Sequence, residues 1–184
     1  MALFIYDWDD TLFPTTWLYE EAFQSPITFE QHEWFNICAA HIKGILTVSM
    51  IYGRVLIITN ASPGWISYCV KRFIPACRPI IERCEIHYAW NAYEPDYTLW
   101  KKHYLMSYVE STLPIKCVLG IGDRSHDREA VRTAFLGKCI VKTIQLMHEP
   151  PVIQVVLQLK MLMDGFGQLM NAGYLDLQTC QLVA

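Results

Sequence analysis

Four short runs rich in isoleucine, valine and leucine recur along this chain, and segments with helical periodicity lie between them. The apolar runs are 3–6, 55–59, 117–121 and 139–144, with a weaker one at 85–90. The helical segments are 29–51, 63–73, 96–111, 128–135 and 152–170. Strands that alternate with helices form a sheet that is mainly parallel and covered on both faces. The sequence therefore predicts a doubly wound, Rossmann-like α/β fold.

Length and composition favour one domain over residues 1–184. The chain has 184 residues, of which 53% are hydrophobic and 18% are charged, and this suffices for one substantial core. No repeat or low-complexity linker interrupts it. The longest excursion between predicted strands is the segment 13–52, which we expect to form a small helical insert, a cap or flap at the edge of the sheet.

Charge and cysteine content restrict partners and location. The formal net charge is −3 with the basic residues scattered, so we expect no sequence-independent nucleic-acid binding and no anionic membrane surface as a partner. The seven cysteines form no CxxC pair, which favours reduced thiols and a cytoplasmic location. We expect no targeting or membrane-spanning segment.

Polar residues gather directly after the predicted strands. They are Asp7, Asp9, Asp10, Thr11, Thr59, Asn60, Asp123 and Asp127. In doubly wound folds the carboxyl ends of the strands share one rim, where ligands bind. Carboxylates that converge there repel one another unless a hard divalent cation neutralises them, and such a cation binds phosphate oxygens well. The pattern predicts a Mg²⁺ site that receives a phosphoryl group.

Four motifs resemble those of the haloacid dehalogenase (HAD) superfamily. LFIYDWDDTL resembles its first motif, an apolar strand followed by Asp-x-Asp-x-Thr, and VLIITNAS resembles the second, a strand ending in Thr or Ser. YTLWKKHYL supplies a lysine for the third, and GIGDRSHD matches the last, Gly-Asp with a further acid four residues on. The resemblance spans residues 3–127 and implies a phosphatase with a small or absent cap. Asp10 stands where that family often has glycine.

The resemblance implies a Mg²⁺-dependent phosphohydrolase that works through an aspartyl phosphate. Asp7 would attack phosphorus and bind the metal. Asp9 would protonate the leaving oxygen, activate water for the second step and bind the metal through its backbone carbonyl. This division splits one difficult displacement into two easier ones.

The remaining motif positions would hold the metal and the phosphoryl group. Thr59 is implied to bind phosphoryl oxygens, and the residues themselves suggest that Asn60 assists through its backbone N–H. Lys101 would offset negative charge on the nucleophile and the transferred group. Asp123 would bind Mg²⁺, and Asp127 would support the metal directly or through water. Phosphoryl transfer depends chiefly on such positioning and charge stabilisation.

Several assignments have close alternatives. Lys101 and Lys102 diverge by roughly 100° on a helix, so only one can point at the rim; the Trp-Lys pairing favours Lys101, with Lys71 a weaker choice. We expect Asp10 to be a solvated or turn-capping residue and His126 to be solvated in a loop.

The aromatic residues near the rim have two readings. Trp8, Phe13, Trp17, Tyr19 and Trp65 favour packing in the core or a lid over binding a planar substrate.

The sequence also leaves alternatives open for the substrate and for the class of protein. A modest insert suits a phosphoprotein or another bulky phosphomonoester, while a nucleotide or small phosphometabolite is the alternative. Closure by a neighbouring copy is another option, so a homo-oligomer is among the expected assemblies. A receiver-like phosphorylatable signalling module and a catalytically quiet scaffold are the competing classes, although a receiver would have adjacent acids and a phosphoacceptor on a middle strand.

Overall fold

A single parallel sheet organises the chain in the computed structural model, which describes residues 1–23, 26–91, 94–111, 115–173 and 175–178. Its strands are β1 (Ala2–Tyr6), β2 (Gly53–Thr59), β3 (Glu85–Tyr88), β4 (Cys117–Gly122), β5 (Ile140–Gln145) and β6 (Leu175–Gln178). They lie in the order β3-β2-β1-β4-β5-β6, and all neighbours pair in parallel. The predicted doubly wound α/β fold is confirmed.

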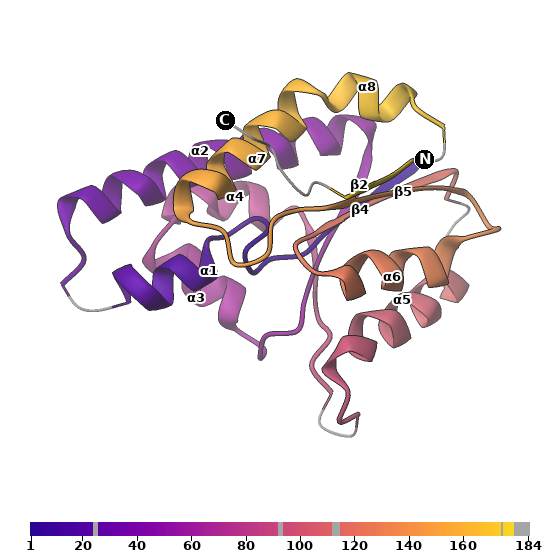
Figure 1. Cartoon of the computed structure of the whole chain (residues 1–184), viewed down its shortest axis with the longest axis horizontal. Coiled ribbons are helices and arrows are strands. Elements are labelled where there is room, and N and C mark those ends of the chain that lie inside the picture. Colours follow the sequence, from indigo (N-terminus) through magenta and orange to yellow (C-terminus); the bar gives the residue numbers. More distant parts are fainter. Residues whose placement is uncertain (24–25, 92–93, 112–114, 174, 179–184) are drawn as a thin grey trace.

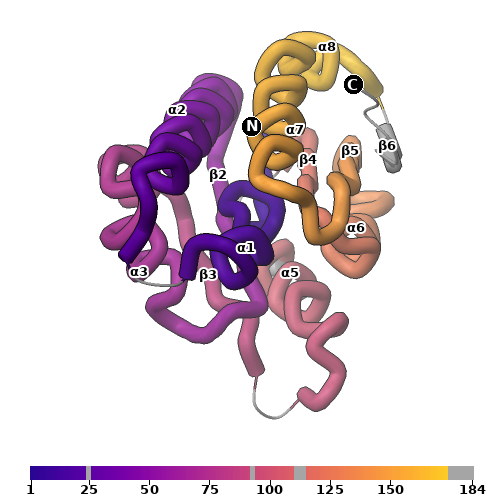
Figure 2. The backbone as a smooth tube through the Cα atoms, turned by 60° about the vertical axis from the view of Figure 1, so that its left-hand side comes forward, coloured from indigo at the N-terminus to yellow at the C-terminus, as the bar shows by residue number. Residues whose placement is uncertain are grey.

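Helices cover both faces of the sheet (Figure 1). One face carries α2 (Phe29–Tyr52), α3 (Trp65–Arg72), η2 (Pro75–Cys77), α4 (Arg78–Ile81), α7 (Val152–Asp164) and α8 (Phe166–Asn171). The other carries α5 (Trp100–Ser111) and α6 (Ser125–Phe135), with η3 (Tyr97–Leu99) leading into α5. The short α1 (Thr15–Trp17) and the π-helical η1 (Leu18–Ala22) follow β1. Figure 2 shows α2 beside α7, and α5 beside α6.

The central strand β1 shows why this sequence forms a buried sheet. Successive side chains of a strand point to opposite faces. Phe4 and Tyr6 accordingly pack in the core under α2 and α7, whereas Leu3 and Ile5 pack in the core under α5 and α6. Every residue of β1 is buried. An uninterrupted apolar run is therefore what both faces of this strand require.

The insert after β1 contributes its long helix to the main core. A capping box of Thr28 and Gln31 starts α2, and side chains such as Phe35, Ile42 and Ile45 are fully buried against the sheet. By length and composition α2 could also cross a membrane, a criterion that core helices of soluble proteins meet as well. The expected role of segment 13–52 as a cap or flap stays a prediction.

The structure corrects several predicted boundaries. The predicted helix 152–170 is two helices, divided at Gly165, and α6 begins at Ser125, earlier than residue 128. The predicted strand 85–90 ends at Tyr88, and β6 was not predicted from the sequence. Among the described residues, six cysteines carry free thiols, while Cys180 lies outside them. The helix starts and strand ends matter most here, because they aim side chains at the rim of the sheet.

Candidate active site

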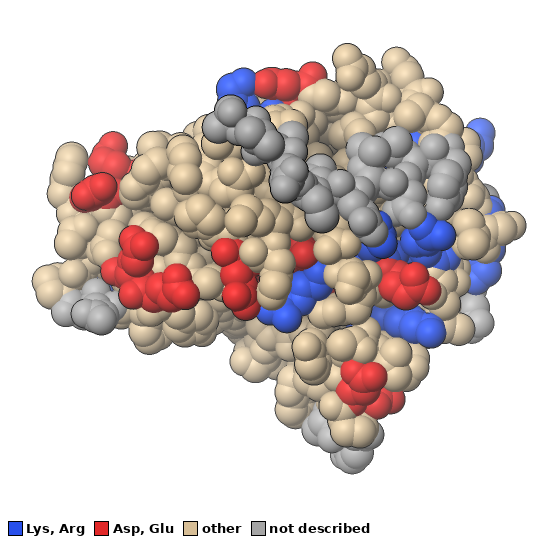
Figure 3. All heavy atoms as spheres, viewed as in Figure 1, with Lys and Arg blue, Asp and Glu red and all other residues tan. Residues whose placement is uncertain are grey.

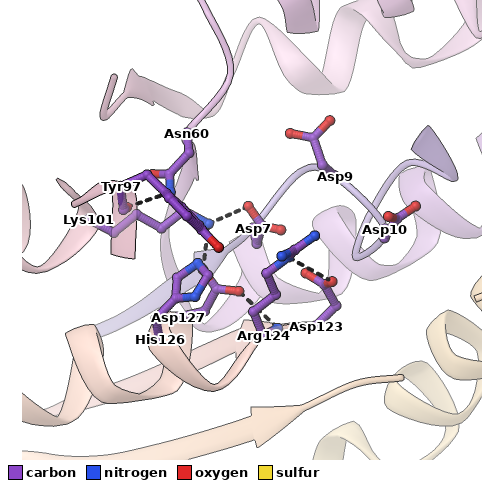
Figure 4. Close-up of a pocket in the computed structure, with 10 residues that line it drawn as sticks. All are labelled: Asp7, Asp9, Asp10, Asn60, Tyr97, Lys101, Asp123, Arg124, His126 and Asp127. Atoms are coloured by element: carbon purple, nitrogen blue, oxygen red, sulfur yellow. Dashed lines mark hydrogen bonds and ion pairs between the residues drawn. The ribbon is translucent and has the colours of Figure 1, made fainter. Parts of the chain in front are cut away.

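The site lies where the chain direction across the sheet reverses. β1 is followed by β2 on one side, and the chain later returns to place β4 on the other side of β1. Ligands of doubly wound folds bind beyond the carboxyl ends of the strands at such a switch point. An open pocket of about 360 Å³ occurs there in this structure. It is lined by Asp7, Asp9, Asp10, Asn60, Tyr97, Lys101, Asp123, Arg124, His126 and Asp127 (Figure 4).

Lys101 joins two buried carboxylates across this pocket. Its Nζ lies 2.5 Å from Asp7 Oδ1 and 2.6 Å from Asp127 Oδ1. The lysine comes from α5, on the opposite side of the site from the chain that follows β1, and it is only 4% exposed. Lys102 is partly exposed and lies outside the pocket. Of the two adjacent lysines, Lys101 is the one that the fold brings to the site.

Asp127 fixes the lysine and the start of α6 together. One of its oxygens binds Lys101, and the other accepts a 3.1 Å hydrogen bond from the backbone N–H of Arg124, which precedes the helix. Gly122 permits this arrangement, since a Cβ atom there would lie 2.5 Å from the Cβ of Asp127. Both oxygens of Asp127 therefore already have partners, which favours a supporting role over direct metal ligation.

Asp123 follows β4 and carries a partner that sequence reasoning missed. His148, from the loop after β5, places Nδ1 3.0 Å from Asp123 Oδ2, and the Arg124 guanidinium lies 3.8 Å from the same oxygen. Glu149, next to the histidine, lies 3.3 Å from His148 Nε2. His148 is distant in sequence from every motif, so spacing carries no signal for it. Only the pairing of β4 with β5 brings its loop to the rim.

Negative charge exceeds positive charge in this cluster. Asp7, Asp123 and Asp127 each offer an oxygen within 4.8 Å of the others, and all three are buried. Burial, followed by the neighbouring carboxylates, raises the pKa of Asp7 well above its ordinary value although Lys101 opposes the rise. Burial alone would lower the pKa of Lys101, but Asp127 and Asp7 outweigh it and keep the ammonium charged. A hard divalent cation would neutralise the remaining charge, so these residues fit a metal ion.

Asp9 is held by three donors and points away from Lys101 (Figure 4). Its Oδ1 accepts hydrogen bonds of 2.7 Å from Thr15 Oγ1 and from the indole Nε1 of Trp65, and its Oδ2 accepts one of 2.7 Å from Thr59 Oγ1. Thr59 belongs to the predicted site, whereas Thr15 and Trp65 were not predicted as its partners. The turn ahead of α3 aims Trp65 at the site, and Gly64 adopts φ +95° in that turn, which suits glycine.

Asp10 is buried, so the first of its two expected roles, a solvated residue, is wrong. It is 5% exposed, and its carboxylate accepts hydrogen bonds from the backbone N–H and the hydroxyl of Thr16, at 2.8 and 2.6 Å. The turn-capping alternative is thus confirmed. Its φ is +56°, in the left-handed region that glycine, asparagine and aspartate tolerate best. This conformation explains how Asp10 can occupy a position where the resembling family often has glycine.

Asn60, Tyr97 and His126 form one wall of the pocket. Asn60 Nδ2 donates to the carbonyl of Tyr97 at 3.0 Å, while its buried Oδ1 has no hydrogen-bond partner among the residues that the structure describes. His126 lies on α6, not in a solvated loop as expected, and its half-buried ring meets Tyr97 edge to face at 5.7 Å. Burial lowers the pKa of His126 despite the nearby charge of Asp127.

The aromatic residues near the rim divide into two groups. Trp8, Phe13 and Trp17 are buried in the main core, and Trp8 stacks on Phe13 with centroids 5.5 Å apart, as the packing interpretation predicted. Tyr19 is 55% exposed and stacks on the half-buried Trp65 at 5.8 Å, with 7° between the rings. Trp65 also packs against the edge of the main core, so this pair lies at the surface beside Asp9.

The fold and the site define a parallel α/β protein with a buried acid cluster and one paired lysine at the carboxyl edge of its sheet. On the face drawn in Figure 3, neither sign of charge forms a continuous surface.

The chain matches no protein-family model, and comparisons with curated proteins and with solved structures likewise found no match.

Proposed function

We propose that this chain is a Mg²⁺-dependent phosphatase of the HAD type that forms an aspartyl phosphate on Asp7. The observation that carries the proposal is the Asp7–Lys101 contact beside two further buried carboxylates. A carboxylate attacks an anionic phosphate poorly unless positive charge screens the repulsion. Lys101 supplies part of that charge. The excess of carboxylate over ammonium supports a divalent cation as the source of the rest.

The proposed nucleophile is Asp7, whose two oxygens differ in their contacts. Oδ1 binds Lys101 at 2.5 Å, whereas, among the residues that the structure describes, Oδ2 accepts only a long hydrogen bond, 3.4 Å from Thr11 Oγ1. In the first step one Asp7 oxygen bonds to phosphorus and the bond to the leaving oxygen breaks. The Asp7 backbone is fixed by its N–H, which donates to the carbonyl of Ile121 at 2.9 Å.

Asp9 is the proposed acid and base. To protonate the leaving oxygen, Oδ2 of Asp9 must release the hydroxyl of Thr59, while Oδ1 keeps the hydrogen bond from Trp65. The freed hydroxyl can then donate to a phosphoryl oxygen, the role expected of Thr59. In the second step Asp9 takes a proton from water, whose oxygen attacks phosphorus and releases Asp7.

The proposed metal ligands are Asp7, Asp123 and the backbone carbonyl of Asp9, with Asp127 supporting them through Lys101. The bound cation would stabilise negative charge that develops on the phosphoryl oxygens. Asn60 and Tyr97 would border the phosphoryl group on the other side of the pocket. The pocket is not enclosed, which suits a substrate larger than its phosphate.

Hydrolysis of p-nitrophenyl phosphate tests the proposal. We expect turnover with Mg²⁺, none with EDTA, and a loss of about 10³-fold or more in Asp7→Asn, since the nucleophile is removed. Asp164→Asn is the matched control, because Asp164 is an exposed acid that pairs with Lys160 on α7.

Calorimetric titration with Mg²⁺ gives a second reading that does not depend on turnover. We expect binding by the wild type and much weaker binding by Asp123→Asn. Full activity in Asp7→Asn would contradict the aspartyl phosphate. A phosphorylated Asp7 that persists for minutes would favour a receiver-like module, and an absence of both turnover and Mg²⁺ binding would favour a scaffold.

A further inference from the structure

A row of aromatic side chains lies on the surface beside Asp9. It consists of Phe23, Tyr19, Trp65 and Tyr68, which we call the aromatic row. Neighbouring ring centroids lie 5.1, 5.8 and 5.8 Å apart along it. Phe23, Tyr19 and Tyr68 are 50%, 55% and 46% exposed. The row joins the insert after β1 to α3, two segments that lie next to each other in Figure 1.

The row differs from the aromatic packing beneath it. Phe13, Phe35 and Trp8 are fully buried and fill the core. Tyr19 instead presents its ring to solvent and stacks on the half-buried Trp65, with 7° between the two planes. Contiguous apolar surface of this kind on a protein commonly marks a binding site, whereas single exposed aromatic residues do not.

Trp65 connects the row to the chemistry of the pocket. Its indole Nε1 donates to Asp9 Oδ1 at 2.7 Å, so the edge of the ring touches the carboxylate that is proposed to protonate the leaving oxygen. The leaving oxygen must come within hydrogen-bond reach of that carboxylate. A group bonded to this oxygen is then near Trp65 and, beyond it, Tyr19, which stacks on Trp65.

We propose that the aromatic row selects phosphomonoesters of aromatic alcohols, such as the phosphorylated side chain of tyrosine, an inference that rests on the proposed phosphatase function. In an aryl phosphate the ring is bonded to the ester oxygen and so meets the row while that oxygen meets Asp9. In a nucleoside monophosphate a sugar separates the base from the phosphate, and in an alkyl phosphate no aromatic ring is present. Offset and edge-to-face contacts between aromatic rings then favour the aryl ester.

The reaction balances with the residues already named. An Asp7 oxygen forms a bond to phosphorus, and the bond between phosphorus and the aryl oxygen breaks, leaving its electron pair on that oxygen. The aryl oxygen takes the proton of Asp9 and departs as the phenol. Water then attacks phosphorus, Asp9 regains a proton, and the bond to Asp7 breaks to release inorganic phosphate.

The decisive experiment compares phenyl phosphate with cyclohexyl phosphate in three variants. Comparing variants cancels the higher intrinsic reactivity of the aryl ester. We expect Tyr19→Leu to lower the phenyl-to-cyclohexyl ratio of kcat/KM by about 3- to 10-fold, the range for one aromatic pair. Tyr19→Phe should retain the ratio. Tyr52→Leu is the matched control, because Tyr52 is 46% exposed but lies at the far end of α2, beside the start of β2.

A binding assay separates this inference from the proposed function. Phenylphosphonate and cyclohexylphosphonate cannot be hydrolysed, and calorimetry with Mg²⁺ present measures their dissociation constants for the same variants. A Tyr19-dependent preference for phenylphosphonate, with no phosphoester hydrolysed, would overturn the phosphatase and leave the aromatic row as a ligand site. An unchanged ratio in Tyr19→Leu would overturn the inference, and so would a larger effect of that substitution on adenosine 5′-monophosphate than on phenyl phosphate.

Discussion

Replacement of Lys101 by methionine should destabilise the protein severely in the absence of divalent cations. Methionine keeps the length and apolar body of the side chain but removes the ammonium that binds Asp7 and Asp127 at 2.5 and 2.6 Å. These carboxylates are 6% and 7% exposed, so water cannot replace the lost partner. Breaking a buried ion pair by removing one partner costs about 3–5 kcal/mol. In a chain of this size, that corresponds to a fall in Tm on the order of 10 °C.

The assay is urea unfolding in EDTA, followed by circular dichroism, with Lys102→Met as the control. Lys102 is the adjacent lysine but lies outside the pocket, so its replacement should change the free energy of unfolding by less than about 0.5 kcal/mol. A second variant, Lys101→Met with Asp127→Asn, also removes one of the two carboxylates that have lost their lysine. It should recover part of the lost free energy of unfolding.

The loss should also depend on pH, with a definite sign. Burial raises the pKa of Asp7 in the folded protein, and Lys101 opposes that rise. A group whose pKa is raised on folding favours the folded state below its unfolded pKa, near 4, and this contribution is lost as pH rises through the folded pKa. Without Lys101 the pKa of Asp7 rises further, so the deficit should be small near pH 4 and grow toward pH 7. A pH-independent deficit, or equal losses in Lys101→Met and Lys102→Met, would refute the reasoning.

Three further predictions concern residues around the site and in the core. The buried Lys142 donates to two carbonyls at the end of α8, at 2.6 and 2.9 Å, so Lys142→Met should cost about 1–3 kcal/mol by thermal unfolding. Gly122→Ala would place a Cβ 2.5 Å from Asp127 and should cost about 1–3 kcal/mol in urea, whereas Gly167→Ala, with open space around it, should not show this steric loss. Burial raises the pKa of Cys38 to about 12, so at pH 8 a disulfide reagent should label this thiol only after unfolding; rapid labelling of the folded protein would contradict its burial.

The sheet was largely predictable because its strands need apolar side chains on both faces. β1, β2 and β4 are buried throughout or nearly so, and their apolar composition predicts buried strands. β6 was missed because LDLQ is short and half polar, and it pairs with β5, a strand from which α7 and α8 separate it in the chain.

In the candidate site, the residues that follow strands were predictable, and those that reach the site from loops were not. Asp7, Thr59 and Asp123 share the rim because the strands before them are parallel neighbours. His148 reaches it from a loop, and Trp65 from the first residue of α3 after the turn at Gly64, so their positions depend on backbone geometry. For Asp10 the sequence offered an acid, but not its burial or its hydrogen bonds to Thr16.

The position of β1 between β2 and β4 has a consequence for how the protein is made. Asp7 and Lys101 are separated by 94 residues, and β4 follows Lys101 in the chain. During synthesis the acidic turn after β1 must stay hydrated until α5 and β4 have emerged, since neither the ammonium nor the second flanking strand exists before then. Contacts that are so distant in sequence form slowly. A nascent chain that stalls before β4 would expose one edge of β1. Its unpaired backbone N–H and C=O groups could then pair with another chain and cause aggregation.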